Sequence, residues 1–127
     1  MKKIEILIVI DSAGALASGN LENNVYMVDT NQWLGSWNEG QCNLHTLCAD
    51  QQLLCWRVEA ISEDSEVSIA DFNGTMIQDR VCVPRQAGDG SWEGRVETQG
   101  GFGRYSYTAT LAIDGNQLSF TPYVDVQ

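Results

Sequence analysis

The segment Ile4-Glu5-Ile6-Leu7-Ile8-Val9-Ile10-Asp11 decides how the rest of the chain is interpreted. It can be read as the apolar part of a secretion signal or as the first strand of a β-sheet. Its unbroken apolar run, Ile6 to Ile10, is shorter than the roughly 7–15 apolar residues of a signal peptide. Isoleucine and valine dominate the run and a charge bounds it at each end, which is typical of a buried strand. The segment therefore predicts a first core strand over Ile4–Ile10.

The remainder of the chain predicts short strands separated by turns. Strands are expected at 25–28, around 42–46, and at 53–61, 67–72, 76–83, 92–98, 104–113 and 117–126, with a polar loop at 12–24. Asn73-Gly74 and Asp114-Gly115 have the composition of hairpin turns. No segment has a sustained 3.6-residue apolar repeat. We expect a single domain over residues 1–127, an all-β, antiparallel β-sandwich of about eight or nine strands.

Composition limits the partners of the chain. Its 127 residues carry a formal net charge of −10. Such a charge repels the phosphates of nucleic acids and the anionic surfaces of membranes, so we expect neither as a partner. With the signal peptide set aside, we expect a cytoplasmic protein, and a signal-independent route of secretion stays open.

The even count of cysteines permits two disulfides among Cys42, Cys48, Cys55 and Cys82, but thiols stay reduced in the cytosol, where a free cysteine behaves as a small buried apolar residue. Cys42, His45 and Cys48 also form a Cys-x2-His-x2-Cys pattern that could hold zinc. On an extended strand, however, His45 would face away from both cysteines, which would lie about 20 Å apart. We therefore expect no metal and no cofactor.

Catalytic motifs do not occur in the sequence. His45 is the only histidine, and the Gly-x-Ser-x-Gly pattern of a nucleophile elbow is missing, so we predict that the chain is not an enzyme. The best candidate for a ligand-binding surface is Trp33 and Trp37 with Asn38 and Glu39 beside them. Two indole faces next to hydrogen-bonding groups suit a sugar or a partner protein. The same tryptophans could instead cap one end of the sandwich core.

Four stretches match the patterns of one known family nearly from end to end. They are Ile4–Ser12, Tyr26-Met27-Val28, Leu54-Cys55-Trp56-Arg57 and Pro122-Tyr123-Val124-Asp125-Val126. On these stretches the chain resembles the AidA/PixA family of bacterial inclusion-body proteins. It departs from the family at Ala49, where the family has glycine, and at Thr121, where it has aspartate.

The resemblance implies a small, non-enzymatic β-sandwich protein, of a kind that is often quorum-regulated and sometimes stored in cytoplasmic inclusions. We therefore expect the chain to self-associate as a homo-oligomer. The alternative is a soluble module that binds a carbohydrate or a protein partner through the tryptophan surface.

Overall fold

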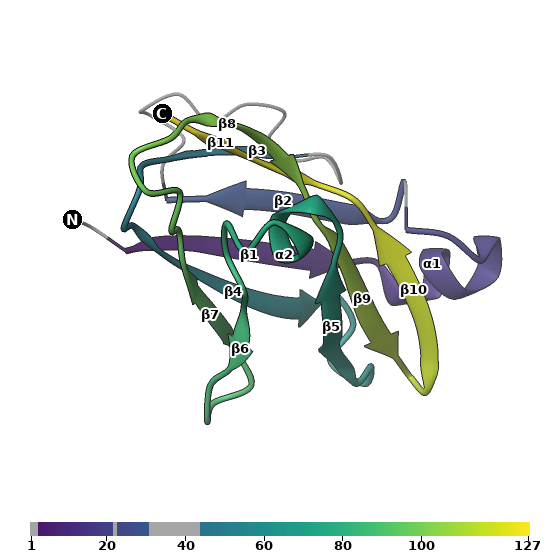
Figure 1. The fold of residues 1–127 in the computed structure, drawn as a ribbon. Coiled ribbons are helices and arrows are strands. Elements are labelled where there is room, and N and C mark those ends of the chain that lie inside the picture. The colour runs from purple at the N-terminus through teal and green to yellow at the C-terminus, as the bar shows by residue number, and fades with distance from the viewer. Residues whose placement is uncertain (1–2, 22, 31–43) are drawn as a thin grey trace.

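The computed structural model describes residues 3–21, 23–30 and 44–127. Figure 1 shows how this part of the chain folds into strands with two short helices. The strands are β1 (Ile4–Ile10), β2 (Val25–Asp29), β3 (His45–Cys48), β4 (Leu53–Ala60), β5 (Val67–Asn73), β6 (Arg85–Gln86), β7 (Trp92–Arg95), β8 (Gly103–Ser106), β9 (Thr108–Ile113), β10 (Asn116–Phe120) and β11 (Tyr123–Val126). The helices are α1 (Ser12–Ser18) and α2 (Thr75–Gln78). The predicted all-β class is confirmed.

The strands form two layers. The first is a five-stranded sheet in the order β2-β1-β4-β7-β6, and the second consists of the sheets β10-β9-β5 and β3-β11-β8. The second layer is continuous, because β8 pairs with β11 and β9 pairs with β10 along one antiparallel ribbon. At the junction the Tyr107 N–H donates to the Pro122 carbonyl at 3.0 Å. Figure 1 shows this ribbon bending from β8 and β11 at the top to β9 and β10 on the right.

The hydrophobic core lies between the two layers. Every second residue of β1 points into it, and Ile4, Ile6, Ile8 and Ile10 are all buried. Burial of each isoleucine stabilises the fold by roughly 1.5–3 kcal/mol. The predicted first core strand is therefore confirmed, with the predicted boundaries.

Two strand pairs run parallel, although the sequence predicted an antiparallel sandwich. β1 pairs parallel with β4, and β11 pairs parallel with β3. After β2 the chain crosses to the second layer as β3 and returns as β4 on the free edge of β1, so β4 points the same way as β1. Alternation of apolar and polar residues shows which face of a strand is buried, and it carries no information on the direction of the partner strand.

The polar loop predicted over residues 12–24 is wrong at its start, where α1 forms. The side chain of Asp11 caps the helix by accepting a hydrogen bond from the Gly14 N–H at 3.1 Å. Gly19 ends it in the left-handed conformation, with φ of 77°, which glycine adopts without steric cost. The alanines between these two caps favour a helix.

The strand predicted at 76–83 and the hairpin predicted at Asn73-Gly74 are also wrong. α2 begins directly after Gly74, whose φ is 104°. A Cβ at Gly74 would lie 3.1 Å from the Cα of Tyr107, so glycine serves here for close packing as well as for its conformation. The hairpin predicted at Asp114-Gly115 is confirmed between β9 and β10.

Three cysteines lie in the described part of the chain, and all three are free and buried: Cys48, Cys55 and Cys82. Burial is the main reason why the pKa values of the Cys48 and Cys82 thiols rise to about 12. These thiols therefore act as small apolar side chains in the core. Cys42 lies outside the described residues.

Candidate functional site

The outer face of the five-stranded sheet carries apolar side chains where polar ones are usual. Leu7 and Val9 of β1 point away from the core and are half-buried, while Tyr26 and Val28 of β2 are 48% and 40% exposed. Sheets that face water on one side normally show polar residues there. We call these four residues the outer apolar patch.

Strand register brings the patch together. Leu7 lies between Val28 of β2 and Arg57 of β4, and Val9 lies between Tyr26 and Glu59 in the same way. In each of these two rows, the side chains on β2 and β1 are apolar and the side chain on β4 is charged. Directly opposed side chains on adjacent strands are in contact distance, so the apolar groups form one continuous surface.

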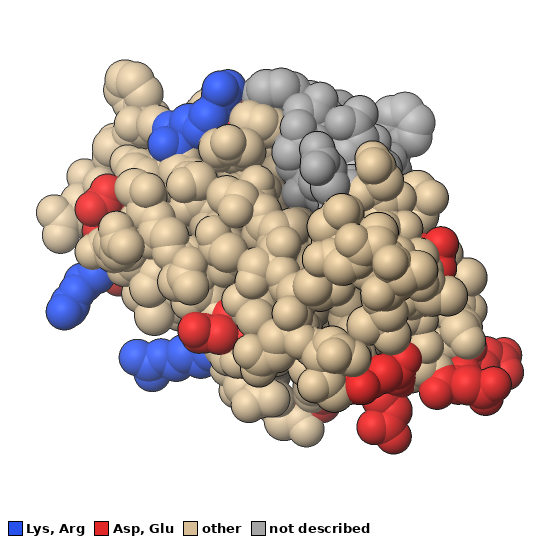
Figure 2. All heavy atoms as spheres, turned by 90° about the vertical axis from the view of Figure 1, so that its right-hand side faces the viewer, with Lys and Arg blue, Asp and Glu red and all other residues tan. Residues whose placement is uncertain are grey.

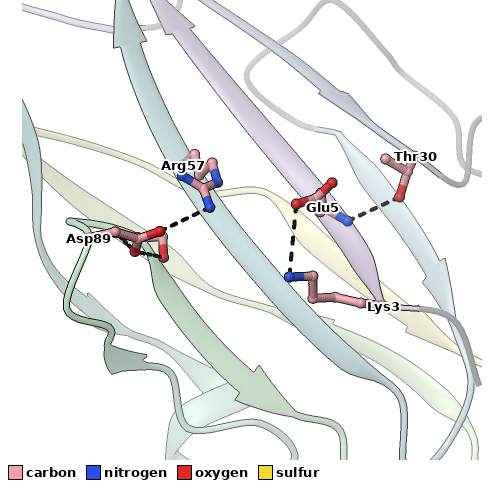
Figure 3. Close-up of polar contacts among 6 residues, drawn as sticks. Lys3, Glu5, Thr30, Arg57 and Asp89 are labelled. Atoms are coloured by element: carbon pink, nitrogen blue, oxygen red, sulfur yellow. Dashed lines mark hydrogen bonds and ion pairs between the residues drawn. The ribbon is translucent and has the colours of Figure 1, made fainter.

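Charged and polar side chains lie on the same strands as the patch, and Figure 3 shows the contacts among them. Arg57 donates to Asp89 at 3.0 Å, and Lys3 pairs with Glu5 at 3.9 Å. Hydrogen bonds from Ser91, and the charge of Arg57 to a smaller extent, lower the pKa of Asp89 to about 2. Both exposed pairs contribute little to stability, so their charges remain available to a partner.

A shallow hollow of about 460 Å³ lies at the charged end of the patch. Its lining includes the side chains of Glu5, Leu7, Val28, Thr30 and Arg57. The Glu5 N–H donates to the Thr30 hydroxyl at 3.0 Å, which ties β1 to the end of β2 beside the hollow. The outer face is thus a surface of mixed character, with an apolar centre and a rim that carries both signs of charge.

Comparison with known proteins gives the family. The sequence profile of a family described as a domain of unknown function (DUF8788) matches residues 2–119. The chain belongs to this family. No curated protein matches the chain.

The DUF8788 chain has the fold of an inclusion body protein (PixA) from Burkholderia cenocepacia J2315, seen in a crystal structure. The TM-score is 0.68 at 13% sequence identity, and the match covers 98% of this chain and 93% of the other. The resemblance to the AidA/PixA family that the sequence predicted is therefore confirmed at the level of the fold.

The ligand-binding surface predicted at Trp33, Trp37, Asn38 and Glu39 lies outside the described residues, and it stays a prediction. The outer apolar patch was missed by the sequence reasoning. The signal for it was present in β1, where two of the three positions that face away from the isoleucines are Leu7 and Val9 rather than polar residues.

His45, considered above as a zinc ligand, is buried in β3. Its ring stacks on Tyr123 with centroids 4.5 Å apart, and its Nδ1 lies 3.4 Å from a carboxylate oxygen of Asp125. Arg104 binds the other oxygen of Asp125 at 2.9 Å. Burial lowers the pKa of His45, although Asp125 acts in the opposite direction. Within the described residues no three metal-binding side chains come together, and Cys42 lies outside them.

Within the described residues, the two helices are too short to span a bilayer.

Proposed function

We propose that this chain is a non-enzymatic protein of the inclusion-body type that self-associates in the cytoplasm through its outer apolar patch. The observation that carries the proposal is the pair Tyr26 and Val28, which expose apolar surface beside Leu7 and Val9 on an open sheet face. The fold shared with an inclusion body protein supports the same function. The non-enzymatic role is consistent with the burial of His45, a residue that is 5% exposed and whose ring is stacked on Tyr123.

The partner on the patch is a second copy of the chain. A two-fold arrangement uses the same surface on both copies. Because the rim carries both signs, such an arrangement can place Arg57 of one copy near Glu5 or Glu59 of the other. Complementary charges set the orientation of a contact more than its affinity, which the apolar centre supplies.

Four apolar side chains form a small interface, well below the size of a stable dimer. The net charge of −10 further opposes contact between copies. Figure 2 views the end of the molecule that carries α1 and β10, and it shows a group of acidic side chains at the lower right, while the basic side chains of this view lie on its left. The contact is therefore weak, and assembly occurs only at high protein concentration, as in an inclusion.

Sedimentation equilibrium over a wide concentration range tests the proposal with the double variant Tyr26→Ser and Val28→Ser. We expect the wild-type chain to associate at high concentration, and the association constant of the variant to fall about tenfold or more, since apolar burial is lost on both copies.

The matched control is Ile61→Ser with Val83→Ser, because these residues are also exposed and apolar, at 61% and 45%, but lie outside the patch. The control is expected to associate like the wild type. A wild-type chain that stays monomeric at the highest attainable concentration contradicts the proposal, and so does an equal loss in the control.

A further inference from the structure

A second hollow, of about 660 Å³, lies between β6, β7 and the segment that follows α2. Arg80, Arg85 and Arg95 line it, together with Gln86, Glu93 and Glu97. The whole chain has only 7 Lys and Arg residues against 17 Asp and Glu residues. Three of those few cations therefore share one hollow, where arginines outnumber carboxylates although the chain as a whole is strongly acidic.

Within the described part of the chain, two of these arginines have guanidinium groups without a partner. Among the described residues, neither Arg80 nor Arg85 makes an ion pair or a side-chain hydrogen bond. The basic side chains that form ion pairs there are Lys3, His45, Arg57 and Arg104. Arg95 donates one hydrogen bond, to the Gln51 carbonyl at 2.7 Å. A guanidinium presents five donors in a planar fork that matches a carboxylate or a phosphate.

Arg80 occupies a backbone position that normally belongs to glycine. Its φ is 56°, in the left-handed region directly after α2. The Arg80 N–H donates to Ile77 O at 3.1 Å and the Val81 N–H donates to Met76 O at 3.0 Å, which is the hydrogen-bond pattern of a Schellman motif. A side chain at this position strains the backbone, because its Cβ comes close to the following carbonyl oxygen. Residues held in such conformations are concentrated at functional sites.

Comparison with an adjacent hollow favours the arginine-lined hollow as the site of an anion. Arg80 also borders an adjacent hollow of about 600 Å³, but Asp79 and Glu97 line that one with Arg80 as the only arginine. A polyanion would meet the repulsion of the acidic chain as a whole. A small anion interacts mainly with the charged side chains that line the hollow, and it is less affected by the net charge of the chain. The volume of the arginine-lined hollow is also typical of small-molecule pockets.

We propose that the hollow binds a small molecule through a carboxylate or phosphate group that is held by Arg80 and Arg85. Gln86 adds a neutral amide beside this group, and Glu93 and Glu97 select for ligands that carry a hydrogen-bond donor or a positive charge away from the anion. The proposal is independent of self-association, because the outer apolar patch and this hollow share none of their residues.

The test is a titration followed in ¹H–¹⁵N correlation spectra at low ionic strength, with inorganic phosphate in one series and malonate in another. We expect shifts confined to residues 80–87 and 93–97. Arg80→Gly and Arg85→Gln are each expected to weaken binding about tenfold, the loss of one charge-assisted hydrogen-bonding group. Arg80→Gly is also expected to leave the fold as stable as the wild type or more stable, which the same spectra and a urea titration show.

The matched control is Arg104→Gln, which removes the same charge from an exposed site outside both the hollow and the outer apolar patch. It is expected to bind both probes like the wild type. Saturation by phosphate alone assigns the site to phosphate groups, saturation by malonate alone assigns it to carboxylates, and saturation by both assigns it to either anion. The proposal is overturned if neither probe shifts these residues, if the two hollow variants bind unchanged, or if the control loses as much affinity as they do.

Discussion

At the scale of single residues, the centre of the core is held by a polar contact between two aromatic side chains. Trp56 and Tyr107 are both fully buried, and the Trp56 indole N–H donates to the Tyr107 hydroxyl at 3.2 Å. Phe72 packs on both rings. Because a tryptophan N–H away from water needs an acceptor, this bond fixes how the two layers meet.

Replacing Tyr107 with phenylalanine keeps the ring and removes this acceptor. We expect Tyr107→Phe to lower the free energy of unfolding by about 1–3 kcal/mol, because the buried Trp56 N–H is left unsatisfied. Urea unfolding monitored by tryptophan fluorescence measures the change. The control Tyr26→Phe removes an exposed hydroxyl and is expected to change stability by less than about 0.5 kcal/mol; similar losses in both variants would contradict the assigned bond.

The sequence predicted some residue roles and missed others for a physical reason. Trp56 lies in the strand predicted at 53–61, and that strand carries it into the core. Asp11 was read only as the charge that ends β1, whereas its carboxylate caps α1. A capping interaction depends on the backbone geometry of the three following residues, which apolar periodicity does not report.

At the scale of elements, the strands were predicted better than the helices. α1 has 7 residues and α2 has 4, which is too short for a 3.6-residue apolar repeat to become visible. The signals that remain are local: Asp11 and Gly19 at the two ends of α1, and the alanines between them.

The Asp11 cap gives an element-scale prediction. We expect Asp11→Ala to reduce the free energy of unfolding by about 1 kcal/mol, since the first turn of α1 loses its side-chain acceptor. Asp11→Asn keeps an acceptor oxygen and is expected to retain most of that stability. Asp64→Ala, in the exposed loop after β4, serves as the charge control in the same urea titrations. Equal losses for the Ala and Asn variants at Asp11 would show that charge, and not capping, explains the effect.

Strand direction is the other element-scale property that sequence could not supply. The ends of β1 and β4 were predicted nearly to the residue, but their parallel pairing depends on the path of the chain through the other layer. For the same reason, the sequence could not show that Leu7 and Val9 meet Val28 and Tyr26 of the adjacent strand. The outer apolar patch is a product of register, and register becomes visible only in the assembled sheet.

At the scale of the whole molecule, the proposed self-association depends on the balance between apolar contact and charge repulsion. Two copies with a formal net charge of −10 each repel one another strongly at low salt. At about 0.15 M ionic strength the Debye length falls to about 8 Å and most of this repulsion is screened.

We therefore expect the association constant to rise with added salt, and to rise again as the pH is lowered toward the isoelectric point of about 4.2, where carboxylates become protonated. Light scattering at fixed protein concentration across salt and pH measures both trends. The double variant Tyr26→Ser and Val28→Ser should respond much less to salt. Dissociation on adding salt would show that ion pairs, and not the apolar patch, hold the copies together.

The buried thiols can also be used to detect transient separation of the two layers of strands. With pKa values of about 12, Cys48 and Cys82 hold only on the order of one thiolate in 10⁵ at neutral pH while the chain is folded. An alkylating reagent in the surrounding solution reacts with thiolates that it can reach, so the labelling rate of these two cysteines rises with the population of the state in which the layers part. The native cysteines thus report how often the folded chain opens, without any engineered residue.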